Sequence, residues 1–308
     1  MKYLNRPDTE PCGVLIVNKH AGVTSHDIVG KVRRLYGTRR VGHTGTLDPM
    51  ATGVLVVLVG RAAKASEYLM SDRKTYCATL RLGTVTDTGD TSGTVLSQSD
   101  AIPDYAALQA VLPRFRGEIL QTPPMYSAIK VGGRKLVDLA RRGETVERAP
   151  RPVTVYSLDA EPTDRPTDYS LTVTCSGGTY VRTLCEDIGA SLGCGGTMAS
   201  LCRLETGGFP LSAARTIAGL EALSPEERLA ALLPVERLFA ALPAVAPQAF
   251  YARLIRDGCA VAQRKLGCDL PVGQRVRLLD PSGAFFALGD AVETEEGAAI
   301  KAVKIFVL

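Results

Sequence analysis

The chain has 308 residues, a formal net charge of +4 and a hydrophobic fraction of 45%. These values are typical of a globular protein of one large or two ordinary domains, with a core that needs no stabilising disulfide or metal. No apolar run approaches the roughly 20 residues of a membrane-spanning helix, and the segment from Met1 to Asn5 does not begin a signal peptide. We therefore expect a cytoplasmic protein that has no membrane partner.

The cysteine and histidine content argues against a metal site. The eight cysteines include no Cys-x-x-Cys pair, and the three histidines (His20, His26 and His43) lie in the first 43 residues. Zinc sites need closely paired ligands on a loop or turn. We therefore expect no metal ion, and reduced thiols in packing roles.

Basic residues are concentrated in two stretches. Five Lys and Arg residues and no acid lie between Asp27 and Asp48, and seven lie from Lys130 to Arg151 against three acids. Such clusters on an otherwise balanced protein indicate contacts with a nucleic-acid backbone. A solvated helix face is the alternative for either stretch alone.

Hydrophobic periodicity predicts both helices and strands in the first part of the chain. The expected elements are strands at 12–17, 54–59 and 75–82, and helices at 26–35, 62–70 and 105–114. Thr24 and Ser25 offer an N-cap for the first helix. Residues 84–94 are nearly all Gly, Thr, Asp and Ser, so we expect a loop there.

The middle of the chain is expected to contain a basic excursion. Residues 121–126 should be extended, because residues before proline avoid the helical region. A short basic helix is predicted at 135–142, between glycines. We therefore interpret residues 123–152 as a mobile flap.

The remaining elements alternate between strands and helices, and the last ones are mostly strands. The pattern predicts strands at 153–158 and 171–175, a strand end running into a helix over 178–191, a helix at 250–257, and strands at 275–279, 284–288 and 299–307. The composition shifts near 242–247, and the short strands beyond that point indicate a small β-rich terminal module.

One loop carries the strongest indication of chemistry. It reads Gly-His-Thr-Gly-Thr-Leu-Asp-Pro-Met-Ala-Thr-Gly from Gly42 to Gly53, with Asp48 as its one carboxylate. Glycine and proline together can hold a loop in one unusual shape, and the apolar run after it would anchor the loop to a sheet. A rigid loop that aims one acid is a common mounting for a catalytic group. The alternative is a tight turn whose aspartate caps a backbone amide.

Several polar segments elsewhere join this loop. They are 61–68 with Lys64, Lys74-Thr75-Tyr76, 86–90 with Asp90, 121–130, and 178–184. In the last segment we expect Tyr180 and Arg182 on the same side of a strand. From about Leu15 to Phe209 these segments, in this order, resemble the TruB family of bacterial tRNA pseudouridine-55 synthases.

The resemblance implies a fold and a domain division. It implies a mixed α/β catalytic domain over residues 1–246, built on a large mixed, mostly antiparallel sheet with flanking helices, and with an RNA-binding flap at 123–152. It also implies a small β-rich, PUA-like RNA-binding domain over residues 247–308.

The reaction implied by the resemblance is the isomerisation of uridine to pseudouridine at position 55 in the T loop of tRNA. The C1′–N1 bond breaks, the base turns, and the bond is remade through C5. No cofactor is expected, in agreement with the lack of a phosphate-loop or Gly-x-Gly-x-x-Gly motif. The expected partner is the T stem-loop of tRNA, without an obligatory protein partner, and the chain is expected to be a monomer.

The resemblance also assigns roles to individual residues. Asp48 corresponds to the essential aspartate, which acts on the ribose either as nucleophile or as base, and Arg182 to the cation that keeps it ionised. Tyr76 corresponds to the tyrosine beneath the target base, and Tyr180 to a base or sugar contact. His43 corresponds to the histidine that helps to extrude the uridine. The alternatives are a salt bridge for Arg182, a core tyrosine for Tyr76 and a structural hydrogen bond for His43.

Three further positions match family contacts to the substrate. Lys64 could bind phosphate, Asp90 could accept hydrogen bonds from a base edge, and Leu201 could contact the base. A surface role for the first two, and a core role for Leu201, read the same from sequence.

The chain departs from the family pattern at three places. His20 stands in place of a proline, Val137 in place of a tyrosine, and Leu204-Glu205 in place of a more basic pair. These departures concern flap contacts and affinity rather than the chemistry. Three other functions are compatible with parts of the pattern: an RNA-binding module with a vestigial acid, a guide-RNA-dependent isomerase, and a glycoside hydrolase, which would usually need a second acid at a defined separation.

Overall fold

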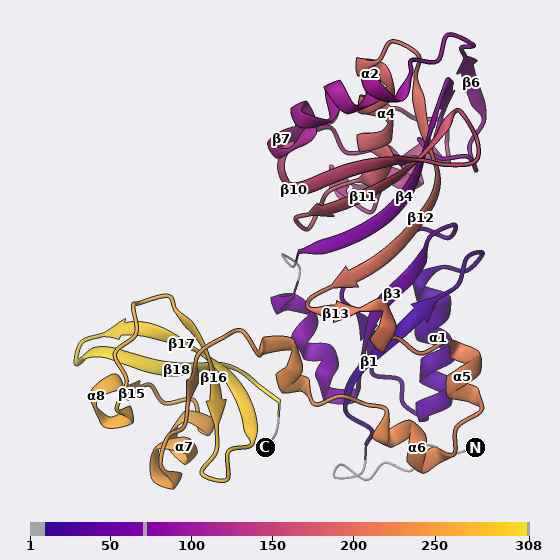
Figure 1. Ribbon diagram of the computed structural model, residues 1–308. Coiled ribbons are helices and arrows are strands. Elements are labelled where there is room, and N and C mark those ends of the chain that lie inside the picture. Colours follow the sequence, from indigo (N-terminus) through magenta and orange to yellow (C-terminus); the bar gives the residue numbers. More distant parts are fainter. Residues whose placement is uncertain (1–9, 70–72, 307–308) are drawn as a thin grey trace.

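A large sheet of nine strands organises most of the molecule (Figure 1). The computed structural model describes residues 10–69 and 73–306. The strands are β1 (Gly13–Lys19), β2 (Val41–His43), β3 (Thr52–Val59), β4 (Lys74–Leu82), β7 (Gly117–Gln121), β10 (Arg151–Pro162), β11 (Asp168–Cys175), β12 (Gly196–Thr206) and β13 (Phe209–Pro210). Their order is β1-β3-β12-β4-β11-β10-β7, with β2 beside β3 and β13 beside β12.

The pairing confirms the predicted sheet type. β12 runs parallel to β3 and antiparallel to β4, and every other pair in this sheet is antiparallel. Cys202 lies opposite Thr52 of β3 and opposite Cys77 of β4, and Arg203 lies opposite Gly53 and Tyr76. We call this junction of β3, β12 and β4 the seam.

Different helices cover the parts of the sheet on the two sides of the seam. α1 (Ser25–Tyr36) starts at the N-cap Thr24, as its sequence predicted, and Asp27 completes a capping box with it. The apolar side of α1 joins β1 and β3 in one core cluster. α4 (Val181–Ser191) packs instead on β12 and β4. The remaining helices of this part are η1 (Gly60–Tyr68), α2 (Tyr105–Val111), η2 (Leu112–Phe115), α3 (Leu136–Ala140), η3 (Leu211–Ala213), α5 (Ile217–Glu221), α6 (Pro225–Ala230) and η4 (Val235–Phe239).

Some predicted elements differ from the observed ones. The helix expected at 62–70 is the 3₁₀-helix η1, and residue 70 lies outside the described residues. The loop expected at 84–94 begins with a strand, β5 (Thr84–Thr86), which pairs with β6 (Val95–Gln98). The strands β7 and β12 were not predicted. β12 has an irregularity in its register at each of two places, so its alternation is broken.

A second sheet of five strands lies at the C-terminal end of the chain (Figure 1). It orders β14 (Ala244–Val245), β16 (Arg275–Leu279), β17 (Phe285–Thr294), β18 (Gly297–Ile305) and β15 (Val261–Ala262), with α7 (Ala249–Arg256) and α8 (Gln263–Leu266) beside them. The sheet has its own core cluster. The β-rich terminal module is therefore present, and residue 307 of its expected final strand lies outside the described residues.

Aromatic packing joins the second sheet to the first. Phe285 and Phe306 lie with ring centroids 5.5 Å apart, and each is about as close to Phe239 of η4. Phe306 and Leu288 belong to the same buried cluster as Val14 and Val54 of the large sheet. The two sheets therefore share apolar contacts, and the predicted boundary after residue 246 stays a prediction.

Among the described residues, no helix is long and apolar enough to cross a membrane.

Candidate active site

The site is centred on an ion pair between Asp48 and Arg182. Asp48 lies in the loop between β2 and β3 with its side chain 34% exposed, whereas the side chain of Arg182 is only 6% exposed. The Arg182 Nε lies 3.0 Å from Asp48 Oδ2, and Nη2 donates to Oδ1 at 3.4 Å. These two contacts fix the direction in which the carboxylate points.

The secondary structure around Arg182 differs from the prediction. Tyr180 and Arg182 do not share the side of a strand: Tyr180 is the N-cap of α4, and Arg182 lies in the first turn of that helix. The Thr-Tyr-Val-Arg-Thr pattern is rich in residues that favour strands, and Tyr180 does have an extended backbone. A cation in the first turn is disfavoured by the helix dipole, so the carboxylate partners of Arg182 account for its position.

The guanidinium of Arg182 joins three further segments. Nη1 donates to the carbonyl oxygen of Thr88 at 3.1 Å, and Nη2 donates to that of Tyr126 at 2.9 Å. Asp90 Oδ2 lies 3.9 Å from Nε. Arg182 therefore holds the Asp48 loop, the 86–90 loop and the start of the flap around one buried cation.

The Asp90 carboxylate is engaged mainly by its own loop. Its Oδ1 accepts hydrogen bonds from Thr88 Oγ1 at 3.0 Å and from the backbone N–H of Ser92 at 3.0 Å, and a further one from the Ser92 hydroxyl. Only 5% of Asp90 is exposed. The structure thus gives Asp90 a role in shaping the loop and in flanking Arg182, and a contact to a base edge stays a prediction.

A buried lysine supports the Asp48 loop from below. Lys19 is 0% exposed, and its Nζ donates to the carbonyl oxygens of Val23 at 2.8 Å, His20 at 3.0 Å and Pro49 at 3.2 Å. Burial lowers the pKa of Lys19 to about 8, although the nearby charge of Asp48 acts in the opposite direction. Pro49, which follows Asp48, therefore accepts a hydrogen bond from a lysine of β1.

A buried arginine supports the same loop from the seam. Arg203 is 1% exposed, and it donates from Nε to the Val54 carbonyl at 2.7 Å and from Nη2 to the Gly45 carbonyl at 3.0 Å. Gly53, with φ of +100°, lies so close that an added Cβ would be 2.3 Å from the Arg203 carbonyl oxygen. Sequence reasoning missed this support, because a buried and an exposed arginine look alike in a sequence.

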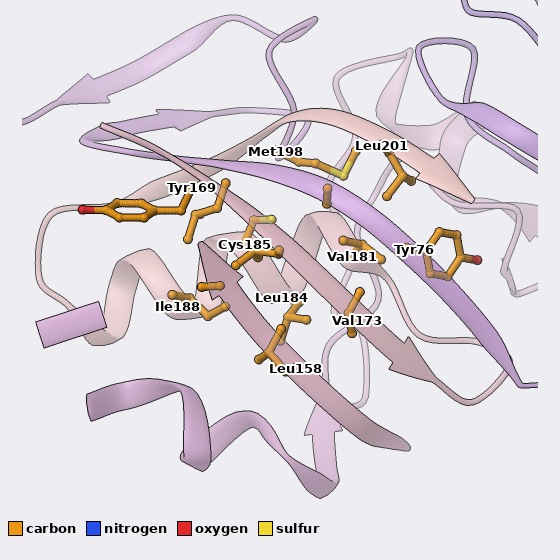
Figure 2. Close-up of a cluster of buried hydrophobic side chains, with 14 of the residues drawn as sticks. Tyr76, Leu158, Tyr169, Val173, Val181, Leu184, Cys185, Ile188, Met198 and Leu201 are labelled. Atoms are coloured by element: carbon orange, nitrogen blue, oxygen red, sulfur yellow. The ribbon is translucent and has the colours of Figure 1, made fainter. Parts of the chain in front are cut away.

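Tyr76 and Leu201 form the apolar wall beside the loop. Both are 8% exposed and lie in one cluster with Leu47 and Ala51, which flank Asp48 in the sequence. Figure 2 shows Tyr76 at the opposite end of the cluster from Tyr169, with its hydroxyl turned away from the other labelled side chains. Burial raises the pKa of the Tyr76 phenol, so its proton is retained at neutral pH.

His43 ends β2 and leaves one ring nitrogen without a partner. Its Nδ1 is buried and has no hydrogen bond to any part of the chain that the structure describes. Burial lowers the pKa of His43, and the positive charges of Arg203 and His26 lower it further. A neutral imidazole has one donor and one acceptor nitrogen, and the structure leaves the buried Nδ1 without a partner among the described residues.

Tyr180 is fixed through its backbone by Gln121, the last residue of β7 before the flap. Gln121 Oε1 accepts from the Tyr180 N–H at 2.7 Å, and Nε2 donates to the Tyr180 carbonyl at 3.0 Å. The tyrosine side chain borders a cavity of about 290 Å³, which Ile129 and Arg151 also line. This amide clamp on α4 was not predicted, because Gln121 and Tyr180 are far apart in the sequence.

The flap is basic, as predicted, but its helix is shorter than expected. α3 covers only Leu136–Ala140, after a small hairpin of β8 (Lys130–Val131) and β9 (Arg134–Lys135). A cavity of about 360 Å³ there is lined mainly by basic side chains, namely Lys130, Arg134, Lys135 and Arg142. This surface has the charge that a phosphate backbone requires.

Lys64 is not joined to the other candidates. It lies exposed on η1, and no hydrogen bond or ion pair within residues 10–69 and 73–306 connects it to Asp48. Within the same residues, no group of three or more His, Cys, Asp or Glu side chains could hold a metal ion. The site therefore consists of the partly exposed Asp48 carboxylate, the buried Asp90 carboxylate, three buried cations and the apolar wall. The cations are Arg182, Lys19 and Arg203.

Comparison with known proteins identifies the class. The TruB family pseudouridylate synthase N-terminal domain matches residues 33–181, and the tRNA pseudouridylate synthase B C-terminal domain matches residues 182–240. A solved structure described as a Cbf5-Nop10-Gar1 complex has a chain of the same fold, with a TM-score of 0.76 and 26% identity, covering 98% of this chain and 88% of that one.

Curated relatives match this chain over almost its whole length. The chain is 41% identical to tRNA pseudouridine synthase B of Clostridium kluyveri, covering 96% of this chain and 99% of the relative. It is 44% identical to the protein of the same name from Burkholderia mallei, covering 91% and 93%. The chain belongs to the TruB family of pseudouridylate synthases.

Proposed function

We propose that this enzyme isomerises uridine to pseudouridine at position 55, in the T loop of tRNA. The relatives that carry the name tRNA pseudouridine synthase B align with more than nine tenths of the chain. The observation that carries the proposal is the Asp48–Arg182 pair, with Nε and Oδ2 3.0 Å apart. It supplies a partly exposed carboxylate held by a buried guanidinium.

Asp48 acts on the ribose. Cleavage of the C1′–N1 bond builds positive charge on the sugar, which a fixed carboxylate stabilises. Arg182 orients the carboxylate, and its hydrogen bonds to the Thr88 and Tyr126 carbonyls keep the guanidinium in place. Asp48 then either attacks C1′ or removes a proton from C2′, and both routes release the base to turn and rejoin through C5.

The base leaves the T loop and enters the space above the apolar wall. Tyr76 stacks beneath it, and the raised pKa of the phenol keeps the hydroxyl protonated for hydrogen bonding. Leu201 and Tyr180 contact the base or sugar from β12 and α4. His43 braces the space that the base leaves, with a ring kept neutral by its lowered pKa.

The remainder of the chain holds the RNA. The basic flap at 123–152 contacts phosphates of the T stem-loop, and Lys64 and Asp90 add polar contacts nearby. Residues 247–308 act as a PUA-like RNA-binding domain beside a catalytic domain of residues 1–246. The reaction needs no cofactor, and the chain works as a monomer without an obligatory protein partner.

A guide-RNA-dependent isomerase is the second candidate. It is favoured by the fold likeness to a chain solved in a complex named for Cbf5, Nop10 and Gar1. The two candidates differ in one simple respect: only the stand-alone enzyme modifies a T stem-loop with no other RNA or protein present.

The test measures tritium release from a T stem-loop RNA labelled at C5 of uridine, using the purified chain alone. We expect release by wild type, none from an RNA with cytidine at position 55, and a loss on the order of 10³-fold in Asp48→Asn, because the charge that stabilises the transition state is removed. The matched control is Asp159→Asn, another aspartate paired with an arginine but on the surface, 70% exposed.

Two results would contradict the proposal. Tight binding of the RNA by wild type without tritium release would leave only an RNA-binding module. Release that depends on an added guide RNA would assign the enzyme to the guide-dependent class.

A further inference from the structure

Two cysteines face each other across the seam. In the antiparallel pairing of β12 with β4, Cys202 lies directly opposite Cys77. The register is regular at this point, because its two irregularities fall between Met198 and Ser200 and between Arg203 and Glu205. Opposed residues of an antiparallel pair point to the same face of the sheet, so the two thiols are neighbours.

Side-chain contacts confirm that this face is shared and open. Two residues along each strand, Thr79 Oγ1 and Ser200 Oγ are 2.7 Å apart across the same pair of strands. Cys77 Sγ lies 3.6 Å from Ser170 Oγ of β11. Because β11 and β12 lie on opposite sides of β4, the Cys77 side chain must rotate to reach Cys202. Both Cys77 and Cys202 are partly exposed, and both thiols are free. A small-molecule oxidant can therefore reach them.

The backbone spacing suits a disulfide. Opposed residues in antiparallel strands have Cα atoms about 4.5 or 5.5 Å apart, and disulfides bridge Cα separations of about 4.4–6.8 Å. Cys175, Cys185 and Cys194 are buried, so an oxidant has no access to them. Burial also raises the pKa of the Cys175 and Cys185 thiols. Cys12 and Cys259 are exposed.

We propose that Cys77 and Cys202 form a reversible disulfide that slows the enzyme. One thiolate attacks a low-molecular-weight disulfide such as oxidised glutathione and releases one glutathione thiol. The second thiolate attacks the protein sulfur of the mixed disulfide and releases the other glutathione. The two cysteines thus lose two electrons and two protons, and the oxidant is reduced to two thiols.

The disulfide would act on the site from the back of the sheet. Tyr76 precedes Cys77 in β4, and Leu201 and Arg203 flank Cys202 in β12. Closing the bond draws the two Cβ atoms to about 3.8 Å, whereas opposed residues have Cβ atoms about 4.5–5.5 Å apart. The strands β4 and β12 must therefore move closer together beneath the apolar wall. Displacements of about 1 Å at an active site can cost about 10²-fold in rate.

The first test reads the bond itself. The folded, reduced protein is treated with oxidised glutathione, free thiols are alkylated, and peptides are analysed by mass spectrometry without reduction. We expect a peptide pair joined through Cys77 and Cys202, which dithiothreitol separates. The Cys259→Ser variant should still form it, and Cys77→Ser should not. Glutathione on Cys12 and Cys259 while Cys77 and Cys202 stay alkylated as free thiols would overturn the proposal.

The second test reads the rate, and it rests on the proposed function. We expect tritium release to fall between about fivefold and about a hundredfold after oxidation, to recover with dithiothreitol, and to resist oxidation in Cys77→Ser. Unchanged release by fully cross-linked protein would overturn the effect on rate. If reduced wild type releases no tritium, the proposed function fails, while the mass spectrum still decides whether the bond forms.

Discussion

The large sheet has two halves, a first half with β1 and β3 on one side of the seam and a second half with β4, β11, β10 and β7 on the other. The two halves bury their residues differently. In β3 seven of the eight residues are buried, since one core cluster lies on each face of the strand. In β4 buried residues alternate with partly exposed ones, because apolar side chains cover only one face. The first half gives a rigid support for the Asp48 loop, and the second half presents α4 and the flap. The ion pair joins a group from each half.

The largest expected effect comes from breaking that ion pair. Arg182→Lys keeps the charge but loses the planar fork that contacts Asp48 and two carbonyl oxygens. We expect kcat to fall by on the order of 10²–10³-fold, measured by tritium release. The control is Arg116→Lys, which changes an exposed arginine paired with Asp159. An Arg182→Lys enzyme with normal kcat would show that the pair only stabilises the fold.

The next effect tests the close approach at the seam. In Gly53→Ala the new Cβ meets the Arg203 backbone at 2.3 Å in a residue with φ of +100°. Strain and overlap together should lower the free energy of unfolding by on the order of 3 kcal/mol, measured by urea denaturation. Gly132→Ala is the control, since its φ is +57° but nothing lies within 4 Å of an added Cβ. Equal losses in the two variants would mean that the contact with Arg203 is unimportant.

A pair of opposite substitutions tests the contrast in burial directly. Val57→Thr buries a hydroxyl in β3, where the residue is 0% exposed, and should lower the free energy of unfolding by about 1–3 kcal/mol. Thr172→Val changes an exposed residue of β11 and should alter it by less than about 0.5 kcal/mol. Both values come from chemical denaturation. Similar losses at the two positions would contradict the distinction between the halves.

The smallest expected effect concerns the pH dependence of Lys19. Its pKa is about 8 in the folded chain, lowered from the ordinary lysine value of 10.5 that the unfolded chain retains, so between these values the unfolded chain binds more protons. Stability from this group therefore rises with pH above about 8, by at most about 2 kcal/mol at pH 9.5.

Thermal or urea unfolding of wild type and Lys19→Met at pH 7.5 and pH 9.5 measures this difference. The variant lacks the titrating amine, and its unfolding free energy should lack this contribution to the slope. Equal slopes in both proteins would show that the folded chain binds Lys19's proton as tightly as the unfolded one.

Local patterns in the sequence were sufficient where one chain segment decides the structure. The N-cap Thr24 starts α1 as expected, and the apolar run after Gly53 forms β3. The Asp48 loop was recognised from its glycines, its proline and its single acid. Strand β12 was missed, because its bulges interrupt the alternation that sequence reasoning uses.

The amino-acid sequence by itself determined the family, the catalytic aspartate candidate and the basic flap, since each depends on consecutive residues. Only the tertiary structure decided that Arg182 reaches Asp48 from the first turn of a helix, that Lys19 and Arg203 support the loop while buried, and that Cys77 faces Cys202. The physical reason is the same in each case. Burial and pairing between distant segments depend on strand order and register, and a single sequence does not display them.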